Sequence, residues 1–404
     1  MQCCFEFFLH VCYFLPEKAV IIFDPCVINL AQRVEPEIPI QLVQGSINPI
    51  IRFRKSEIIR SSLLVAPASV TNAIPSKPIL VQILTAFDIL RSFSRYTGFN
   101  MCGLSGILYK RAGSEGSFHV GNDLVMMLEP MTHRGKDSSG VTIMGEQIDG
   151  DLVIRIWTEN VQDISSVAAR SEETVRHAGG VIRSTSTLDQ FLRLVVNYQG
   201  EVADLADALI KVPGVAIHSI GTTSEVIKDI GTPAMMDVKH GVGEILGTHG
   251  IGHVRMATES RVDVNHAHPF WAYPFPDITV VHNGQLTNYH KLKRMYEDQG
   301  HHFQTGNDSE IIAVYLAGKL AEGQGLKQAL RSSLDDLDGT FTYLVATKDG
   351  LGYAKDQWSA KPLVTMETDD VIAIASEEIS LRGVFAEEIE RIEPQNSEVM
   401  TWLL

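Results

Sequence analysis

Cys102 is the residue of this sequence best suited to do chemistry. The other four cysteines all lie within the first 26 residues, so Cys102 is the only cysteine from Met101 to Leu404. A cysteine before Gly-Leu-Ser-Gly is most often a small core residue, but Met101 directly precedes this one. Removal of an initiator methionine would leave a free α-amine, whose pKa is ordinarily about 7.7–8.0. This amine could accept the thiol proton, so nucleophile and base would belong to one residue.

Asn283 and Gly284 have two alternative interpretations. An Asn-Gly pair is common in tight turns. The amide N–H of an asparagine and a backbone N–H beside a glycine can also converge on a developing negative oxygen, where one donor contributes about 3–4 kcal/mol to the barrier. The sequence alone leaves both open.

Arg255 and Asp308 carry the charges that would bind an amino acid. Arg255 lies in the apolar segment from Gly252 to Thr258, where an arginine is either a solvated edge residue or an inward fork for a carboxylate. Asp308 precedes an expected helix, so it either caps that helix or binds a substrate ammonium group. Together they could bind both charged groups of an amino acid.

Histidines occur in His133-Arg134-Gly135 and in His266-Ala267-His268. Carboxylates or thiols do not accompany them at ligand spacing, so we expect no metal site. The four upstream cysteines lack iron–sulfur spacing, and Gly241-Val242-Gly243 lacks the third glycine of a dinucleotide fingerprint. We therefore expect no cofactor.

The composition is that of an ordinary globular protein, with 404 residues, 45% apolar and 21% charged. The net charge of −15 argues against nucleic acid or an anionic membrane as the main partner. An odd count of five cysteines argues against a disulfide framework and favours the cytoplasm. No apolar run reaches the roughly 18 residues of a membrane span.

Residues 1–100 differ from the rest of the chain. They hold nine basic and seven acidic residues, whereas the remainder holds 25 and 42. Frequent prolines interrupt their short apolar runs, so we expect a weakly structured leader. It is either upstream sequence from an incorrect start, which we favour because Met101 offers an initiator, or a propeptide removed before Cys102.

Residues 101–404 are expected to form one α+β domain. Strands come first, then a cluster of helices and then strands again, which favours antiparallel sheets with helices outside. A section at about 160–245 is expected to be an α+β insertion. The main expected strands are 103–109, 141–144, 152–157, 249–257, 278–281, 341–346, 351–355, 363–366, 371–375 and 398–403, and the main helices are 122–131, 202–210, 288–299, 309–320 and 325–337.

Taken together, the motifs resemble the class II glutamine amidotransferases, a family of N-terminal nucleophile hydrolases. Those most like them are the stand-alone amidotransferase subunits of split glutamate synthase and N-methylglutamate synthase-like systems. The resemblance runs from Cys102 to Glu377. Its seven motifs, in family order, are Cys102-Gly103 with Gly106, His133-Arg134-Gly135 with Asp137 and Gly140, Gly252-His253 with Arg255 and Thr258, His282-Asn283-Gly284, Asn307-Asp308-Ser309-Glu310, Asp338-Gly339 and Ala375-Ser376-Glu377. The likeness to the stand-alone subunits rests on the segment from Gly250 to Ser260 and on Ala267-His268-Pro269-Phe270.

This resemblance implies a four-layer αββα sandwich that hydrolyses L-glutamine to glutamate and ammonia. Cys102 would be the nucleophile and its α-amine the base. Asn283 and Gly284 would form the oxyanion hole. The substrate would be bound by Arg255 at its carboxylate and Asp308 at its ammonium group, with Thr258 and His268 also at the substrate site. Arg134 would support the nucleophile's loop, and a synthase subunit would accept the ammonia.

The chain departs from the family pattern in three places. Lys136 replaces the proline of the usual His-Arg-Gly-Pro-Asp turn, the insertion is long, and the leader has no counterpart. A retained leader would remove the α-amine base. Two alternatives therefore stay open, a related hydrolase with another amide substrate and a non-catalytic assembly or regulatory subunit.

Overall fold

The computed structural model describes residues 13–15, 18–22, 50–54, 101–112, 116–145, 151–257, 261–385 and 390–404. The chain divides into two units, Met1–Gly98 and Phe99–Leu404. In the first unit, strands β1 (Tyr13–Leu15), β2 (Lys18–Ile22) and β3 (Ile50–Arg54) pair antiparallel in that order. The prediction of a weakly structured leader falls mostly outside the described residues.

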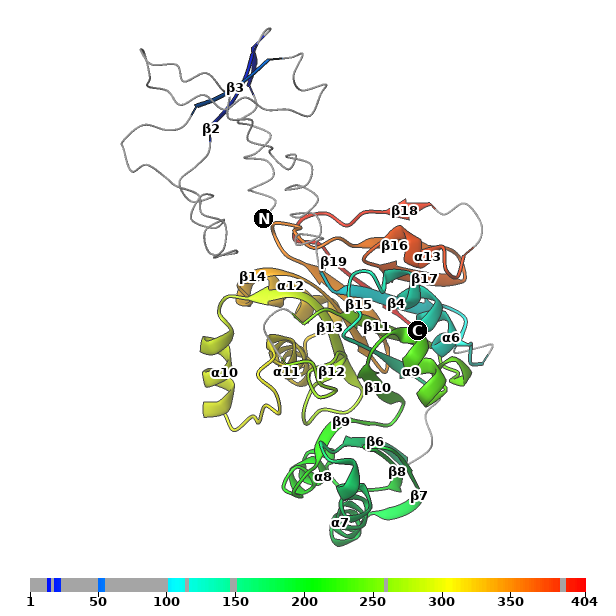
Figure 1. Ribbon diagram of the computed structural model, residues 1–404. Helices are drawn as coiled ribbons and strands as arrows, with labels where there is room; N and C mark the ends of the chain where they lie inside the picture. Colours follow the sequence, from blue (N-terminus) through cyan, green and yellow to red (C-terminus); the bar gives the residue numbers. More distant parts are fainter. Residues whose placement is uncertain are drawn as a thin grey trace, which may run out of the picture. The chain divides into compact units, whose positions relative to one another are not determined.

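The second unit contains a seven-stranded sheet with β4 near its centre (Figure 1). All of its pairings are antiparallel. In spatial order its strands are β10 (Ser224–Ile230), β5 (Ser138–Met144), β11 (His249–Arg255), β4 (Gly103–Tyr109), β17 (Val371–Ala375), β16 (Val364–Glu367) and β18 (Arg391–Ile392).

A five-stranded antiparallel sheet lies against it. Its spatial order is β12 (Phe270–Trp271), β13 (Ile278–Leu286), β14 (Gly339–Thr347), β15 (Gly350–Lys355) and β19 (Val399–Leu403). Apolar side chains from both sheets form one buried cluster between them, including Leu104 and Ile251 from the first and Val281 and Leu344 from the second. Burial of this surface holds the two sheets together.

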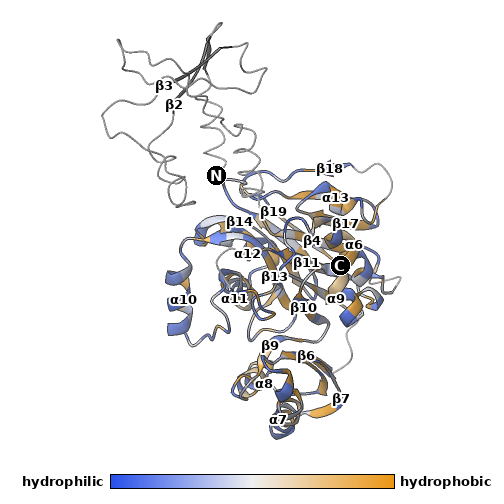
Figure 2. Cartoon of the chain, in the orientation of Figure 1, coloured by the Kyte–Doolittle hydropathy of each residue, from blue (hydrophilic) through white to orange (hydrophobic). Residues whose placement is uncertain are grey.

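Helices cover the outer face of each sheet (Figure 1). Helices α6 (Val120–Leu128), α9 (Pro233–His240) and α13 (Glu378–Leu381) pack on the seven-stranded sheet. Helices α11 (Asp308–Ala321) and α12 (Leu326–Asp336) pack on the five-stranded sheet, and α10 (Tyr289–Asp298) lies outside α11. Figure 2 shows that α10 is hydrophilic, as expected for an outer helix. The predicted four-layer αββα sandwich is thus confirmed.

A third sheet of four strands forms a separate lobe at the lower edge of Figure 1. Its order is β7 (Val181–Leu188), β8 (Phe191–Asn197), β6 (Asp151–Trp157) and β9 (Ala216–Gly221), and α7 (Ile164–His177) and α8 (Val202–Leu209) cover one face. The lobe thus spans 151–221, whereas the sequence suggested about 160–245. The difference arises because β10 and α9 belong to the main sandwich.

Glu225 connects this lobe to the sandwich. Its carboxylate accepts hydrogen bonds from Arg155 on β6, at 2.8 Å, and from Arg193 on β8, at 2.6 Å, while Glu225 itself lies on β10. Because two guanidinium groups donate to one carboxylate, the pKa of Glu225 lies below its usual range despite burial.

Among the residues that the structure describes, none of the helices combines the length and apolar character that a membrane span needs.

Candidate active site

Cys102 lies directly before the central strand β4. Gly103 pairs with Val254 on β11, so Cys102 lies beside Arg255 at the end of the neighbouring strand. The Cys102 thiol is 3.9 Å from the carbonyl oxygen of Met256. Burial raises the pKa of this thiol, although a hydrogen bond with the Met256 backbone and the nearby guanidinium groups of Arg255 and Arg134 oppose the rise. The thiol is therefore a weak acid that needs a base.

The carbonyl oxygen of Cys102 is held from two sides. Arg134 donates to it from Nε at 3.1 Å, and Asn283 donates from Nδ2 at 2.9 Å. Arg134 is buried and also forms an ion pair with Glu377, just after β17. Two side chains from distant parts of the chain, one of them paired with Glu377, thus fix the backbone of the cysteine.

Asn283 and Gly284 lie within β13 rather than in a turn. They pair with Thr342 and Phe341 of β14, so the turn interpretation is wrong. Gly284 has φ of 148°, and a Cβ atom there would lie 2.1 Å from the carbonyl oxygen of Thr340. Only glycine fits this backbone position without strain.

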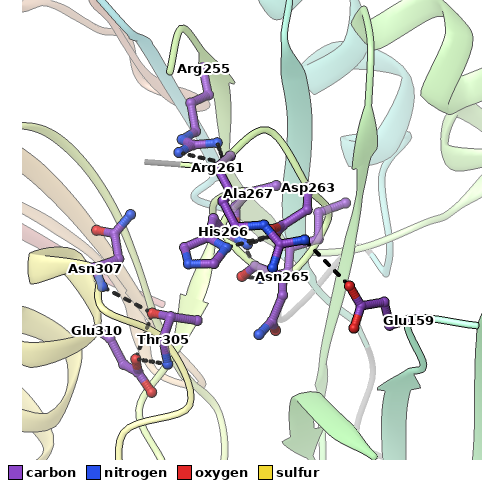
Figure 3. A network of polar contacts seen from close by, with 11 residues as sticks. Glu159, Arg255, Arg261, Asp263, Asn265, His266, Ala267, Thr305, Asn307 and Glu310 are labelled. Atoms are coloured by element: carbon purple, nitrogen blue, oxygen red, sulfur yellow. Dashed lines mark hydrogen bonds and ion pairs between the residues drawn. The ribbon is translucent and has the colours of Figure 1, made fainter. Parts of the chain in front are cut away.

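Arg255 is buried, with 3% of its surface exposed. Its guanidinium donates to the carbonyl oxygen of Arg261 from Nη1 at 3.2 Å and from Nη2 at 3.3 Å (Figure 3). Burial lowers the pKa of Arg255, while Cys102 and Asp263 oppose this change. The interpretation of Arg255 as a solvated edge residue is therefore wrong.

Asp308 is the first residue of α11, but the helix cap is its neighbour Asn307, whose side chain accepts from the Ser309 N–H at 2.9 Å. Asp308 instead accepts from the backbone N–H of Leu286 at 2.9 Å and lies 3.5 Å from Nδ1 of His282. Burial opposes ionisation, but His282 and these hydrogen bonds hold the pKa of Asp308 below its usual range. The capping interpretation of Asp308 is thus wrong, and its carboxylate is ionised near neutral pH.

His268 is enclosed by protein groups. Its Nδ1 accepts from the backbone N–H of His282 at 3.2 Å, and its Nε2 lies 3.4 Å from the hydroxyl of Ser309. Its ring stacks on that of His253 at 4.0 Å. Burial, together with the neighbouring histidines, keeps the pKa of His268 well below its ordinary value. Both ring nitrogens of His268 therefore have protein neighbours. Thr258, the other residue predicted at the substrate site, lies outside the described residues.

Comparison with known proteins places the chain in a family. A protein of Methanothermobacter thermautotrophicus assigned as a glutamine amidotransferase is 40% identical over 73% of this chain and 97% of its own length. This chain belongs to the glutamine amidotransferase family. The glutamine amidotransferase-like protein GlxB of Rhizobium meliloti is 36% identical over 75% of this chain and 98% of its own length. The family described as "Glutamine amidotransferase domain" matches residues 253–383.

More distant similarity extends to larger amidotransferases. The amidophosphoribosyltransferase of Methanocaldococcus jannaschii is 33% identical, covering 44% of this chain and 38% of its own length. The structure of glutamine phosphoribosylpyrophosphate amidotransferase from B. subtilis aligns over 74% of this chain and 47% of its own length, with a TM-score of 0.45 and 19% identity. This chain therefore spans less than half of these larger proteins.

Within this amidotransferase, direct contacts bring together Cys102, Arg134 and Asn283, and strand pairing places Arg255 next to them. Asp308 joins this group through His282, the residue before Asn283. The amidotransferase domain match covers Arg255, Asn283, Gly284 and Asp308 but begins after Cys102 and Arg134.

No site role was predicted from the sequence for Glu377, His282 or Lys228. Glu377 and His282 stand inside motifs of the resemblance, so their positions signalled them, whereas their contacts did not. Lys228 belongs to none of the motifs, and a single lysine in a strand is expected to be solvated. The structure buries it, with 3% of its surface exposed.

Proposed function

We propose that this amidotransferase hydrolyses L-glutamine to glutamate and ammonia with Cys102 as its N-terminal nucleophile. The observation that carries the proposal is the pair of hydrogen bonds that Arg134 and Asn283 donate to the Cys102 carbonyl, with Arg255 at the end of the adjacent strand. Family membership supports glutamine as the substrate. We place the reaction in the cytoplasm, in keeping with the odd number of cysteines.

The chemistry requires a free amine on Cys102. In the full chain this nitrogen is in a peptide bond with Met101, so the active form would begin at Cys102. The α-amine would take the thiol proton, and the thiolate would attack the δ-carbon of the glutamine side chain. The amide nitrogen would leave as ammonia after receiving that proton. Water would then cleave the γ-glutamyl thioester, releasing glutamate and restoring the thiol.

Asn283 and Gly284 are proposed to stabilise the tetrahedral oxyanion. The Nδ2 atom of Asn283 is already fixed beside the nucleophile by its bond to the Cys102 carbonyl. The backbone around Gly284 is fixed by pairing with Phe341. Donors that are held in place before the charge develops need no reorganisation during the reaction, which is why such sites are effective.

Arg255 and Asp308 are proposed to select the amino-acid end of glutamine. A buried guanidinium binds a carboxylate with two parallel hydrogen bonds, and an ionised aspartate pairs with an ammonium group. His268 is proposed to position this site through His282 and Ser309. Thr258 stays a proposed substrate contact on the strength of the motif alone.

The ammonia acceptor is proposed to be a glutamate-synthase-like partner subunit. This part of the proposal rests on the motifs around Arg255 and on Ala267-His268-Pro269-Phe270. Gel filtration of the natively expressed protein, followed by mass spectrometry of co-eluting chains, tests it. A co-eluting FMN- or iron–sulfur-containing synthase chain would support the partner, and a glutaminase that elutes alone and retains full activity would contradict it.

The test of the proposed reaction uses a chain that begins at Cys102. We expect glutamate and ammonia in equal amounts, and stoichiometric labelling of Cys102 by a glutamine-like diazoketone. A Cys102→Ala variant of the same chain is the matched control and should show neither. A folded chain without activity or labelling would instead favour a non-catalytic subunit. Hydrolysis of other amides, with Arg255→Ala neutral, would favour a different hydrolase.

A further inference from the structure

The segment from Arg261 to Pro269 lies between the two parts of the candidate site. At its start, the carbonyl of Arg261 accepts both hydrogen bonds from the Arg255 guanidinium. At its end, His268 contacts the backbone of His282, one residue before Asn283. Figure 3 shows the segment crossing between Arg255 and the loop of Thr305. We call residues 261–269 the bridging loop.

Lys228 on β10 forms hydrogen bonds with the backbone of this loop. Its Nζ donates to the carbonyl of Ala267 at 2.8 Å and lies 3.3 Å from the carbonyls of Asn265 and Pro269. Its ammonium also stands 4.9 Å from the centre of the Phe270 ring. An ammonium has three N–H donors, so these three alternate carbonyls use all of them.

The bridging loop lies directly on the sheet at this point. A Cβ atom on Gly140 of β5 would be 2.1 Å from the carbonyl oxygen of His268 and 2.6 Å from Cβ of Lys228. Gly140 and Lys228 are paired residues of adjacent strands. Glycine at position 140 permits this close approach. The loop therefore lies near enough to β10 for the Lys228 ammonium to reach the loop carbonyls.

Within the described part of the chain, Lys228 has no ion pair that would explain its burial. Among the residues that the structure describes, no carboxylate oxygen forms a salt bridge with its Nζ. Burial lowers the pKa of Lys228 to about 7, while Glu310 and Asp263 oppose this change. A buried cation is costly unless its hydrogen bonds are satisfied, and here backbone carbonyls of one loop satisfy them.

We propose that Lys228 is a positioning residue that holds the bridging loop in the conformation that orients Arg255 for glutamine. The inference rests on the proposed function, since Arg255 is the proposed carboxylate ligand. Strand β13 pairs with β14 from Ile278 to Leu286, so we expect Asn283 to move less than Arg255 when the loop loosens. The Arg255 guanidinium, in contrast, donates to the loop itself, from Nη1 and Nη2 to the Arg261 carbonyl. Loss of Lys228 should therefore weaken glutamine binding more than it slows the chemical step.

The experiment compares Lys228→Met, which keeps the length but loses the donors, with Lys228→Arg, which keeps donors and charge. Chains beginning at Cys102 are assayed below the pKa of Lys228. We expect KM for glutamine to rise about ten- to hundred-fold in Lys228→Met, with kcat changed by less than about threefold, and a smaller rise in Lys228→Arg. The matched control is Val175→Ala in the lobe, a buried truncation away from the loop, which should destabilise the fold and leave KM unchanged.

Hydrogen exchange provides a second measurement that does not depend on activity. Amides of residues 261–269 should exchange faster in Lys228→Met, while those of Ile278–Leu286 should not. An unchanged KM together with unchanged exchange would overturn the proposal, as would equal losses in Lys228→Met and Val175→Ala. If Lys228→Met fails to fold, Lys228→Arg carries the test. A small rise in KM with faster exchange confined to residues 261–269 supports the proposal, whereas a fall in kcat at the wild-type KM, or faster exchange that extends to Ile278–Leu286, contradicts it. Inactive wild type with faster exchange in the variant would contradict only the proposed function.

Discussion

Replacing Asn283 by alanine separates the catalytic role of this residue from its structural one. The change removes the Nδ2 donor that bonds the Cys102 carbonyl at 2.9 Å. The same carbonyl keeps a second donor, Nε of Arg134 at 3.1 Å. The Cys102 carbonyl therefore still has a hydrogen-bond partner in the variant. The stability cost is that of one hydrogen bond, about 0.5–1.5 kcal/mol.

The expected catalytic cost is much larger. Loss of one oxyanion donor lowers kcat about 100- to 1000-fold, equivalent to roughly 2.7–4 kcal/mol of transition-state stabilisation. Binding of the amino-acid end depends on other groups, so KM should change by less than about threefold. Asn283→Ala should thus remain folded, bind glutamine and turn it over very slowly.

Asn288→Ala is the matched control. The Asn288 side chain donates to the carbonyl of Asp336 at 2.9 Å and accepts from the N–H of Asp338 at 3.1 Å, and it lies at the N-cap of α10. It should lose comparable stability and keep its kcat. Release of glutamate is followed for each variant, and urea unfolding measures stability. A fall in kcat below about tenfold for Asn283→Ala, or an equal fall in both variants, would refute the oxyanion assignment.

Three further predictions follow from individual residues. Gly284→Ala places a Cβ 2.1 Å from the Thr340 carbonyl oxygen at φ of 148°; strain and overpacking should lower the free energy of unfolding by about 2–6 kcal/mol, measured in urea. Asp308 has a pKa below its ordinary value, so its contribution to stability is present above about pH 4 and lost as pH falls through its folded pKa; Asp308→Asn should flatten acid unfolding over that range. Burial raises the pKa of Cys102, so in the chain that retains Met101 its alkylation by iodoacetamide, followed on peptides by mass spectrometry, should still increase beyond about pH 9 rather than level off.

Regular elements with strong apolar periodicity were predictable from the sequence. Strands β4 and β17 have the bounds that alternation and turn residues predicted. The strand beginning at Ile278 was predicted to end at Val281, because the Asn-Gly pair that follows resembles a turn. In the structure the ladder to β14 extends it to Leu286. Pairing between distant strands overrode the local turn preference.

The lobe was less predictable. Helix α7 was missed because its buried positions are Val167, Ala168, Ser171 and Val175, so small and polar side chains weaken the helical period. Strand β10 was missed because its pattern is interrupted by Lys228 and Asp229, which are buried among partners that the local sequence does not name.

The candidate site was also predictable only in part. Motif order predicted the individual residues Cys102, Arg134, Asn283 and Arg255, which the structure places around one strand end. The contacts that hold them could not be predicted, because a carbonyl acceptor such as that of Arg261 carries no signal in residue type. The same applies to the three carbonyls around Lys228.

The most direct test of the central claim is glutamine hydrolysis by two otherwise identical chains, one beginning at Cys102 and one retaining Met101. The proposed mechanism predicts that only the chain with a free Cys102 amine forms glutamate and ammonia and is labelled at that thiol. Equal turnover by the chain that retains Met101, with its start verified by intact mass, would contradict the account.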